Sequence, residues 1–332
     1  MDLNKLRFIG RHIKNEGREY FSFSGTGFEF NLIPTAKNCS ITLFMTSVLH
    51  NYDEHYIAIY INDVFHSKEK LTSGLNIIKI KPEKLNKENI IRIIKQNEGY
   101  LSAIYLENIE LENAEFGEIL PSNKEIIGFF GDSLTCGFGL LDLNGQEFKT
   151  ETEEFTKTYA YLSCFALNMD YTVVARSGIS IGIPIYVEKL FGEIYDTVDM
   201  SIKCKEDRIL DYAVINLGTN DNSGYFQKVN DEDKTEALVE FKRKYLDLIQ
   251  RIITDNPKVK IVIAYNMLSL EEIIENAIKD VYSFAIACFS NKMCLLKLIP
   301  NGEGACFHPY WTYHEKNAKL LANAIKELDK RR

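Results

Sequence analysis

The periodicity of the apolar residues changes once along this chain of 332 residues, near Pro121, and this change restricts the possible folds more than any other feature. Before Pro121, short runs such as residues 28–32 alternate apolar and polar side chains between turn residues, which is typical of an antiparallel β-sandwich. After it, apolar runs such as residues 126–130 alternate with longer segments of helical period, which indicates a parallel sheet covered by helices on both faces. We therefore expect two domains, an all-β sandwich at residues 1–118 and an α/β domain at residues 119–332.

The same periodicities predict the individual elements. In the first domain we expect strands at residues 20–24, 28–32, 39–47, 56–61, 75–80, 90–94 and 101–111. In the second we expect strands at residues 126–130, 171–175, 212–217, 259–264 and 294–298, and helices at residues 159–168, 233–254, 270–281 and 311–328. In an open parallel sheet, ligands bind beyond the carboxyl ends of the strands, so polar residues that follow these strands are the first candidates for a site.

Composition narrows the possible partners. The chain has 39 Lys and Arg against 47 Asp and Glu, and the basic residues form no stripe, so we expect neither nucleic acid nor an anionic membrane surface as a partner. No run reaches the apolar length of a membrane span, and the first residues contain no leader-like run. Seven thinly spread cysteines are typical of reduced thiols. We expect a cytoplasmic protein, or a secreted one if the sequence is a truncated form.

Three short motifs follow expected strands and contain the residue types of an acyl-transfer site. Ser133 lies in the motif GDSLT, where a sharp turn exposes a hydroxyl at the top of the sheet; a serine that caps a helix is the other interpretation. Asn220 lies in the motif GTND, and its amide is either an oxyanion donor or part of an Asx-type turn. His308 precedes Pro309, which favours an extended backbone from which an imidazole can point inward. A nucleophile, a donor and a base at three strand ends together indicate acyl transfer.

In this order, the three motifs resemble sequence blocks of the SGNH (GDSL) hydrolases. Gly178, in the segment VARSG, stands where the second block of that family has its oxyanion glycine, and the resemblance covers the chain from Pro121 to its end. It implies a three-layer α/β/α domain in which Ser133 is the nucleophile and His308 is its base. It also implies that the N–H groups of Ser133 and Gly178 and the amide of Asn220 bind the oxyanion, without a metal or another cofactor.

The N-terminal half resembles the jelly-roll domain of carbohydrate esterase family 2, through the segment FSFSGTGFEF and the strand-rich region that follows. That family joins such a sandwich to an SGNH domain and deacetylates plant polysaccharides or their fragments. The resemblance therefore implies an acetyl xylan esterase-like enzyme that acts on acetylated xylan, glucomannan or their oligosaccharides. Two other functions are compatible with the motifs: a lipase or thioesterase with the same site, and a carbohydrate-binding protein whose hydrolase site has decayed.

One position departs from the SGNH pattern. Most SGNH enzymes have an aspartate three residues before the histidine, and here that residue is Ala305. Members of carbohydrate esterase family 2 can work with a Ser-His dyad whose imidazole is oriented by a backbone carbonyl. The resemblance implies the same arrangement for Ser133 and His308. The side chain of Glu303 is the alternative orienting group.

Aromatic residues surround the expected base, namely Phe307, Tyr310 and Trp311. They are candidates for a flat sugar-binding surface, and the alternative is that they seat the last helix on the sheet. Two histidines and two acidic residues also cluster at residues 50–55, which we place in a loop between strands. Their spacing matches no standard set of metal ligands, so we expect no metal there.

Overall fold

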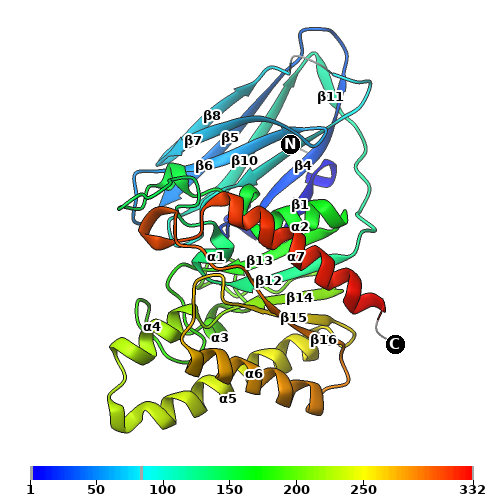
Figure 1. The fold of residues 1–332 in the computed structure, drawn as a ribbon. Helices are drawn as coiled ribbons and strands as arrows, with labels where there is room; N and C mark the ends of the chain where they lie inside the picture. The colour runs from blue at the N-terminus through cyan, green and yellow to red at the C-terminus, as the bar shows by residue number, and fades with distance from the viewer. Residues whose placement is uncertain (1–2, 83–84, 331–332) are drawn as a thin grey trace. The chain divides into compact units, whose positions relative to one another are not determined.

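The computed structural model describes residues 3–82 and 85–330, and the chain forms two compact units (Figure 1). The first unit contains Met1–Asn123 and Thr197–Lys205, and the second contains Lys124–Asp196 and Glu206–Arg332. The first is built from antiparallel sheets and the second from a parallel sheet with helices, so the predicted fold class is confirmed.

Two antiparallel sheets make up the first unit. One has the strand order β1-β4-β9-β6-β7, with β11 paired to β4, and the other has the order β2-β3-β10-β5-β8. A short 3-10 helix, η1 (Leu3–Lys5), precedes them. The strands are β1 Arg7–Ile9, β2 Ile13–Asn15, β3 Arg18–Phe21, β4 Gly27–Pro34, β5 Ser40–Leu49, β6 Glu54–Ile61, β7 Val64–Thr72, β8 Gly74–Ile80, β9 Asn89–Lys95, β10 Ser102–Glu112 and β11 Ala114–Phe116.

Apolar side chains from both sheets form one core in this unit. In β5, Ile41, Leu43 and Met45 are buried, whereas the residues between them are partly exposed. This alternation follows from strand geometry, because successive side chains point to opposite faces. Phe28 and Phe30 on β4 belong to the same core.

Two expectations for the first unit are wrong in detail. The run at residues 20–24 is a strand only to Phe21, where β3 ends and a turn follows. The expected loop at residues 50–55 ends early, because β6 begins at Glu54. His55 is therefore a buried strand residue, and its Nε2 lies 2.8 Å from Ser47 Oγ.

A parallel sheet with the order β13-β12-β14-β15-β16 forms the centre of the second unit. Its three central strands are almost entirely buried, as expected for a sheet covered on both faces. The order places β12 between β13 and β14, so the carboxyl ends of these three strands meet at the point where the strand order reverses. The strands are β12 Ile126–Gly131, β13 Asp170–Ala175, β14 Tyr212–Asn216, β15 Lys260–Tyr265 and β16 Met293–Lys297.

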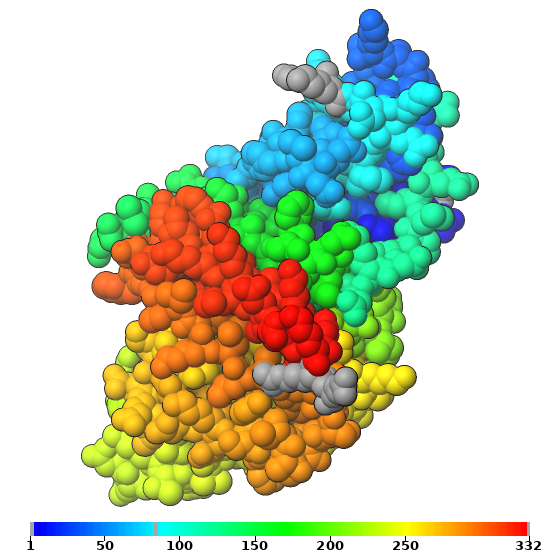
Figure 2. All heavy atoms as spheres, turned by 45° about the vertical axis from the view of Figure 1, so that its right-hand side comes forward, coloured from blue at the N-terminus to red at the C-terminus, as the bar shows by residue number. Residues whose placement is uncertain are grey.

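Helices cover both faces of this sheet: α2 and α7 lie on one side, and α5 and α6 lie on the other (Figure 1). Figure 2 shows α7, in red, along the surface of the unit. None of the helices in the described ranges has the length and apolar character that a membrane crossing requires. The helices are α1 Ser133–Cys136, α2 Tyr159–Leu167, α3 Phe191–Ile194, α4 Thr219–Gln227, α5 Lys234–Asp255, α6 Glu272–Cys288 and α7 Trp311–Lys330, and the short 3-10 helices are η2 Thr150–Thr152, η3 Phe155–Lys157, η4 Asp231–Asp233 and η5 Ala305–Phe307.

Candidate active site

Ser133 is the first residue of α1, directly beyond the carboxyl end of β12. The N-cap of α1 is Asp132, whose Oδ1 accepts the N–H of Leu134 at 3.0 Å, so Ser133 does not cap the helix. The turn needs Gly131, because a Cβ there would lie 2.1 Å from Thr135 Oγ1. The Ser133 hydroxyl is therefore left for another partner.

A buried hydrogen-bond network holds α1 in place. Tyr159, on α2, has its hydroxyl 2.8 Å from Thr135 Oγ1 and accepts a hydrogen bond from Asn216 Nδ2 at 3.1 Å. Asn216 is the last residue of β14, so one hydroxyl joins α1, α2 and the sheet. A buried polar group that loses its partner costs about 1–3 kcal/mol. The network therefore opposes any shift of α1 and of Ser133 with it.

His308 precedes α7, and its two ring nitrogens have different partners. Nε2 lies 2.8 Å from Ser133 Oγ, and Nδ1 lies 3.1 Å from the carbonyl oxygen of Cys306. Because a carbonyl oxygen only accepts, we infer that Nδ1 carries the hydrogen and that Nε2 presents its lone pair to the Ser133 hydroxyl. The structure thus brings the two distant residues into hydrogen-bond contact.

An unusual backbone turn precedes His308. Cys306 has a φ of 50° and Phe307 a φ of 63°, both in the left-handed region that residues other than glycine rarely adopt. Such strained dihedrals persist only where the surroundings hold them. Here the loop after α1 does so: the Ala305 N–H donates to the Gly139 carbonyl at 3.1 Å, and the Cys306 N–H donates to the Gly145 carbonyl at 2.9 Å.

Glu303 is joined to the same loop through its backbone. Its carbonyl oxygen accepts the N–H of Asn144 at 2.6 Å, and its side chain is exposed. Within the described residues, the hydrogen-bond partner of His308 Nδ1 is the Cys306 carbonyl and not the Glu303 carboxylate.

An aromatic ring packs against the imidazole, which is partly buried. The ring of Phe138 lies 4.4 Å from that of His308, and Phe148 stacks on Phe138 at 4.2 Å. Burial lowers the pKa of His308 to about 4, and hydrogen bonds with the backbone of Cys306 and Ala305 oppose this shift. The imidazole is therefore neutral at pH 7, as a general base must be.

Backbone N–H groups near Ser133 are available to an anion. Gly178 follows β13 and has a φ of 78°, a conformation that favours glycine. In the described part of the chain, neither the N–H of Gly178 nor that of Ser133 has an acceptor. These are the two backbone N–H groups that the sequence resemblance implies as oxyanion donors.

Asn220 lies in the first turn of α4, directly beyond β14, and is buried. Its Nδ2 donates to the carbonyl of Ile179 at 2.9 Å and makes a longer contact of 3.4 Å with Asp132 Oδ2. The first bond fixes the amide beside the loop that contains Gly178. At 3.4 Å, the contact with Asp132 is only a weak hydrogen bond. The amide hydrogen that makes it can therefore be donated to a stronger acceptor instead.

The aromatic residues near His308 differ in exposure. Phe307 is 77% exposed, whereas Tyr310 and Trp311 are half-buried at the start of α7, with ring centroids 6.0 Å apart. Tyr186, which the sequence did not single out, is an exposed ring beside Gly178: a Cβ on Gly178 would lie 3.0 Å from Tyr186 Cβ.

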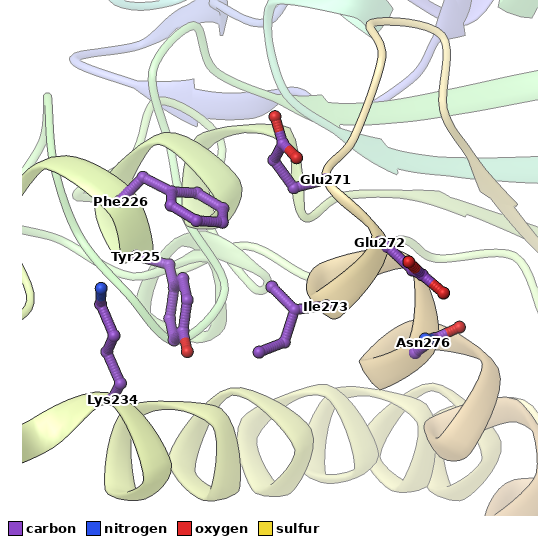
Figure 3. A pocket seen from close by; sticks show the side chains of 7 residues that line it. All are labelled: Tyr225, Phe226, Lys234, Glu271, Glu272, Ile273 and Asn276. Atoms are coloured by element: carbon purple, nitrogen blue, oxygen red, sulfur yellow. The ribbon is translucent and has the colours of Figure 1, made fainter. Parts of the chain in front are cut away.

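A hollow of this unit lies between α4 and α6, and its lining includes neither Ser133 nor His308 (Figure 3). Phe226 and Tyr225 from α4 and Ile273 from α6 face its centre, with Lys234 at one side (Figure 3). Its lining contains no serine, cysteine or histidine, so it offers neither a nucleophile nor an imidazole base.

Solved structures with the same two-part fold are known. A family two carbohydrate esterase from Clostridium thermocellum, in complex with cellohexaose, has a TM-score of 0.86 and 18% identity, over 97% of this chain and 98% of that chain. The acetyl xylan esterase Est2A from the rumen bacterium Butyrivibrio proteoclasticus has a TM-score of 0.82 and 19% identity, over 98% and 96%. A carbohydrate esterase family 2 enzyme from Corynascus thermopiles (Myceliophthora fergusii) has a TM-score of 0.80 and 23% identity, over 98% and 100%.

Neither a protein-family model nor a curated protein sequence matches the chain. The structural likeness nevertheless spans nearly the whole of each compared protein. The predicted resemblance to carbohydrate esterase family 2 is thus confirmed at the level of the fold.

Proposed function

We propose that this protein is a serine esterase that removes O-acetyl groups from acetylated saccharides such as xylan, glucomannan or their oligosaccharides. The observation that carries the proposal is the hydrogen bond of 2.8 Å between Ser133 Oγ and His308 Nε2, in an imidazole whose Nδ1 faces a backbone carbonyl. A hydroxyl beside a neutral, oriented imidazole is the arrangement that nucleophilic acyl transfer requires.

In the first half of the reaction, Ser133 Oγ attacks the acetyl carbonyl carbon while Nε2 of His308 takes the hydroxyl proton. The tetrahedral intermediate collapses, the bond to the sugar oxygen breaks, and Nε2 returns its proton to that oxygen. The acetyl group is then an ester of Ser133. In the second half, Nε2 takes a proton from water, the resulting nucleophile attacks the acetyl-enzyme, and acetate leaves as Ser133 regains its proton.

The charge of each intermediate falls on the former carbonyl oxygen. The N–H groups of Ser133 and Gly178, which have no acceptor in the described structure, and the amide of Asn220 would donate to it. Loss of one such donor in other acyl-transfer enzymes lowers the rate about a hundredfold to a thousandfold. No metal or organic cofactor enters these steps.

The proposed saccharide substrate rests on the fold and on the rim of the site. Phe307 offers an exposed ring next to the base, and Tyr186 offers another beside Gly178, which suits the apolar faces of sugar rings. Solved structures of similar fold include the complex with cellohexaose and the acetyl xylan esterase named above. Both features support a saccharide over a lipid chain, which would need a continuous apolar groove.

An acetate-release assay across acetylated xylan, xylo-oligosaccharides, glucomannan, a triglyceride and 4-nitrophenyl acetate tests the proposal. We expect release from the saccharides and the aryl ester, and its loss in Ser133→Ala with an unchanged melting temperature. Ser290→Ala, an exposed serine of the same unit, is the matched control and should keep full activity. A Ser133→Ala protein that retains activity would refute the assignment, and preference for the triglyceride would favour a lipase.

A further inference from the structure

Asp221 follows Asn220 on α4 and is a fully buried carboxylate that the mechanism above does not use. Its Oδ2 accepts the N–H of Ile181 at 3.0 Å, and its Oδ1 accepts the N–H groups of Gly182 and Ile183, each at 2.7 Å. Three successive backbone N–H groups thus converge on one carboxylate. No lysine or arginine pairs with it in the described part of the chain.

These three amides belong to the loop that contains Gly178. Asn220 holds the same loop at a second point, through the bond of 2.9 Å from its Nδ2 to the Ile179 carbonyl. On its outer side, the loop lies directly against α5, since a Cβ on Gly182 would be 2.6 Å from Phe241 Cα. Two adjacent residues of α4 therefore hold the loop just after Gly178, Asn220 at Ile179 and Asp221 at residues 181–183.

The three N–H groups explain why a carboxylate stands at this place. Burial raises the pKa of Asp221 to about 6, and the three N–H groups act in the opposite direction. An asparagine would present a donor in place of one oxygen and could not accept all three bonds. Only a carboxylate in this position can accept the N–H groups of residues 181–183 together.

We propose that Asp221 is a positioning residue that fixes the loop at residues 178–183, and with it the N–H of Gly178, relative to Asn220. Its effect on rate rests on the proposed function, in which Gly178 and Asn220 donate to the oxyanion. A donor that moves away from the oxyanion weakens the transition state while ground-state binding changes little. Loss of Asp221 should therefore lower kcat more than it changes KM.

The test compares Asp221→Asn with Leu328→Ala at about pH 8, where Asp221 is ionised and His308 is neutral. Leu328 is fully buried near the far end of α7, about 25 Å along the helix from its first residue, so its truncation lowers stability without touching the loop. With 4-nitrophenyl acetate, we expect Asp221→Asn to lower kcat about tenfold to a hundredfold, with KM within about threefold. Leu328→Ala should keep kcat within about twofold.

Amide hydrogen exchange gives a readout that is independent of activity. In the wild-type protein, the amides of residues 181–183 should exchange about a hundredfold more slowly than an exposed loop, and Asp221→Asn should speed up exchange across residues 178–183. Leu328→Ala should leave that segment unchanged. The proposal is overturned if these amides are unprotected in the wild type, if Asp221→Asn leaves exchange unchanged, or if its kcat falls no more than that of Leu328→Ala. A wild-type protein that hydrolyses no ester but shows the expected exchange would instead refute the proposed function.

Discussion

His308 is a weak base in the resting protein, although the proposed mechanism requires it to take a proton. Its Nδ1 faces a carbonyl oxygen instead of a carboxylate, and the ring of Phe138, which stacks on Phe148, packs against the imidazole, so the charged imidazolium is poorly stabilised in the resting protein. A base with a pKa of about 4 is weak for catalysis near neutrality. In the proposed mechanism, an oxyanion forms beside Ser133, and a negative charge a few ångströms away would favour the imidazolium. The base would therefore become strong only while the intermediate exists.

Titration of His308 tests this account of the resting state. Since burial lowers its folded-state pKa, Nε2 gains a proton only when the pH falls to about 4, and the ring stays neutral from pH 5 upward. We expect NMR titration of the Ser133→Ala protein to show this midpoint, with His308→Asn used to assign the signal. Replacing Phe138 with Ala admits water and should raise the midpoint toward 6.5. A midpoint between pH 6 and 7 in the Ser133→Ala protein would contradict the argument.

The loop after α1 and the turn before α7 act as one element. Their backbone hydrogen bonds, from Ala305 to Gly139 and from Cys306 to Gly145, hold the left-handed turn whose carbonyl faces His308. In this arrangement Ala305 is fully buried and packs against the loop, since a Cβ on Gly139 would lie only 2.6 Å from Ala305 Cβ. The site therefore has no space for an aspartate at residue 305.

Placing the aspartate of the SGNH pattern at residue 305 should consequently not improve the enzyme. We expect Ala305→Asp to lower the free energy of unfolding by about 3 kcal/mol, because it overpacks the contact with Gly139 and buries a carboxyl group, and to lower kcat as the turn shifts. Ala287→Asp, at an exposed position on α6, is the control and should change stability by less than about 1 kcal/mol. Urea unfolding and kcat measured on both variants decide the matter. A more active Ala305→Asp enzyme would show that the histidine can use a side-chain carboxylate there.

At the scale of the whole molecule, the elements with one clear period were predictable. The strand at residues 126–130 and the helix at residues 233–254 appear as β12 and α5, with ends that differ by one residue. In contrast, β7 does not follow from its sequence, because most of its residues are exposed and it has no apolar alternation. The segment Thr197–Lys205 belongs to the first unit, although in the sequence it lies between two parts of the second unit. No local sequence pattern indicates that a segment of the second half packs with the first unit.

In the candidate site, too, some residues were predictable from the sequence and others were not. Ser133, Asn220 and His308 stand out because polar residues that follow buried strands share one edge of the sheet. Phe138, Phe148 and Asp221 do not, because their contacts depend on how loops fold back on that edge. The left-handed backbone at Cys306 was also unpredictable, since no glycine marks it.

The central claim is that His308 activates Ser133, and a small fluorophosphonate ester tests it most directly, because such reagents form a stable bond with activated serines. Peptide mass spectrometry of the treated full-length protein should place the label on Ser133. The account predicts rapid labelling of that residue in the wild type and almost none in His308→Ala. Label on a different residue, or equally fast labelling of Ser133 without the imidazole, would contradict it.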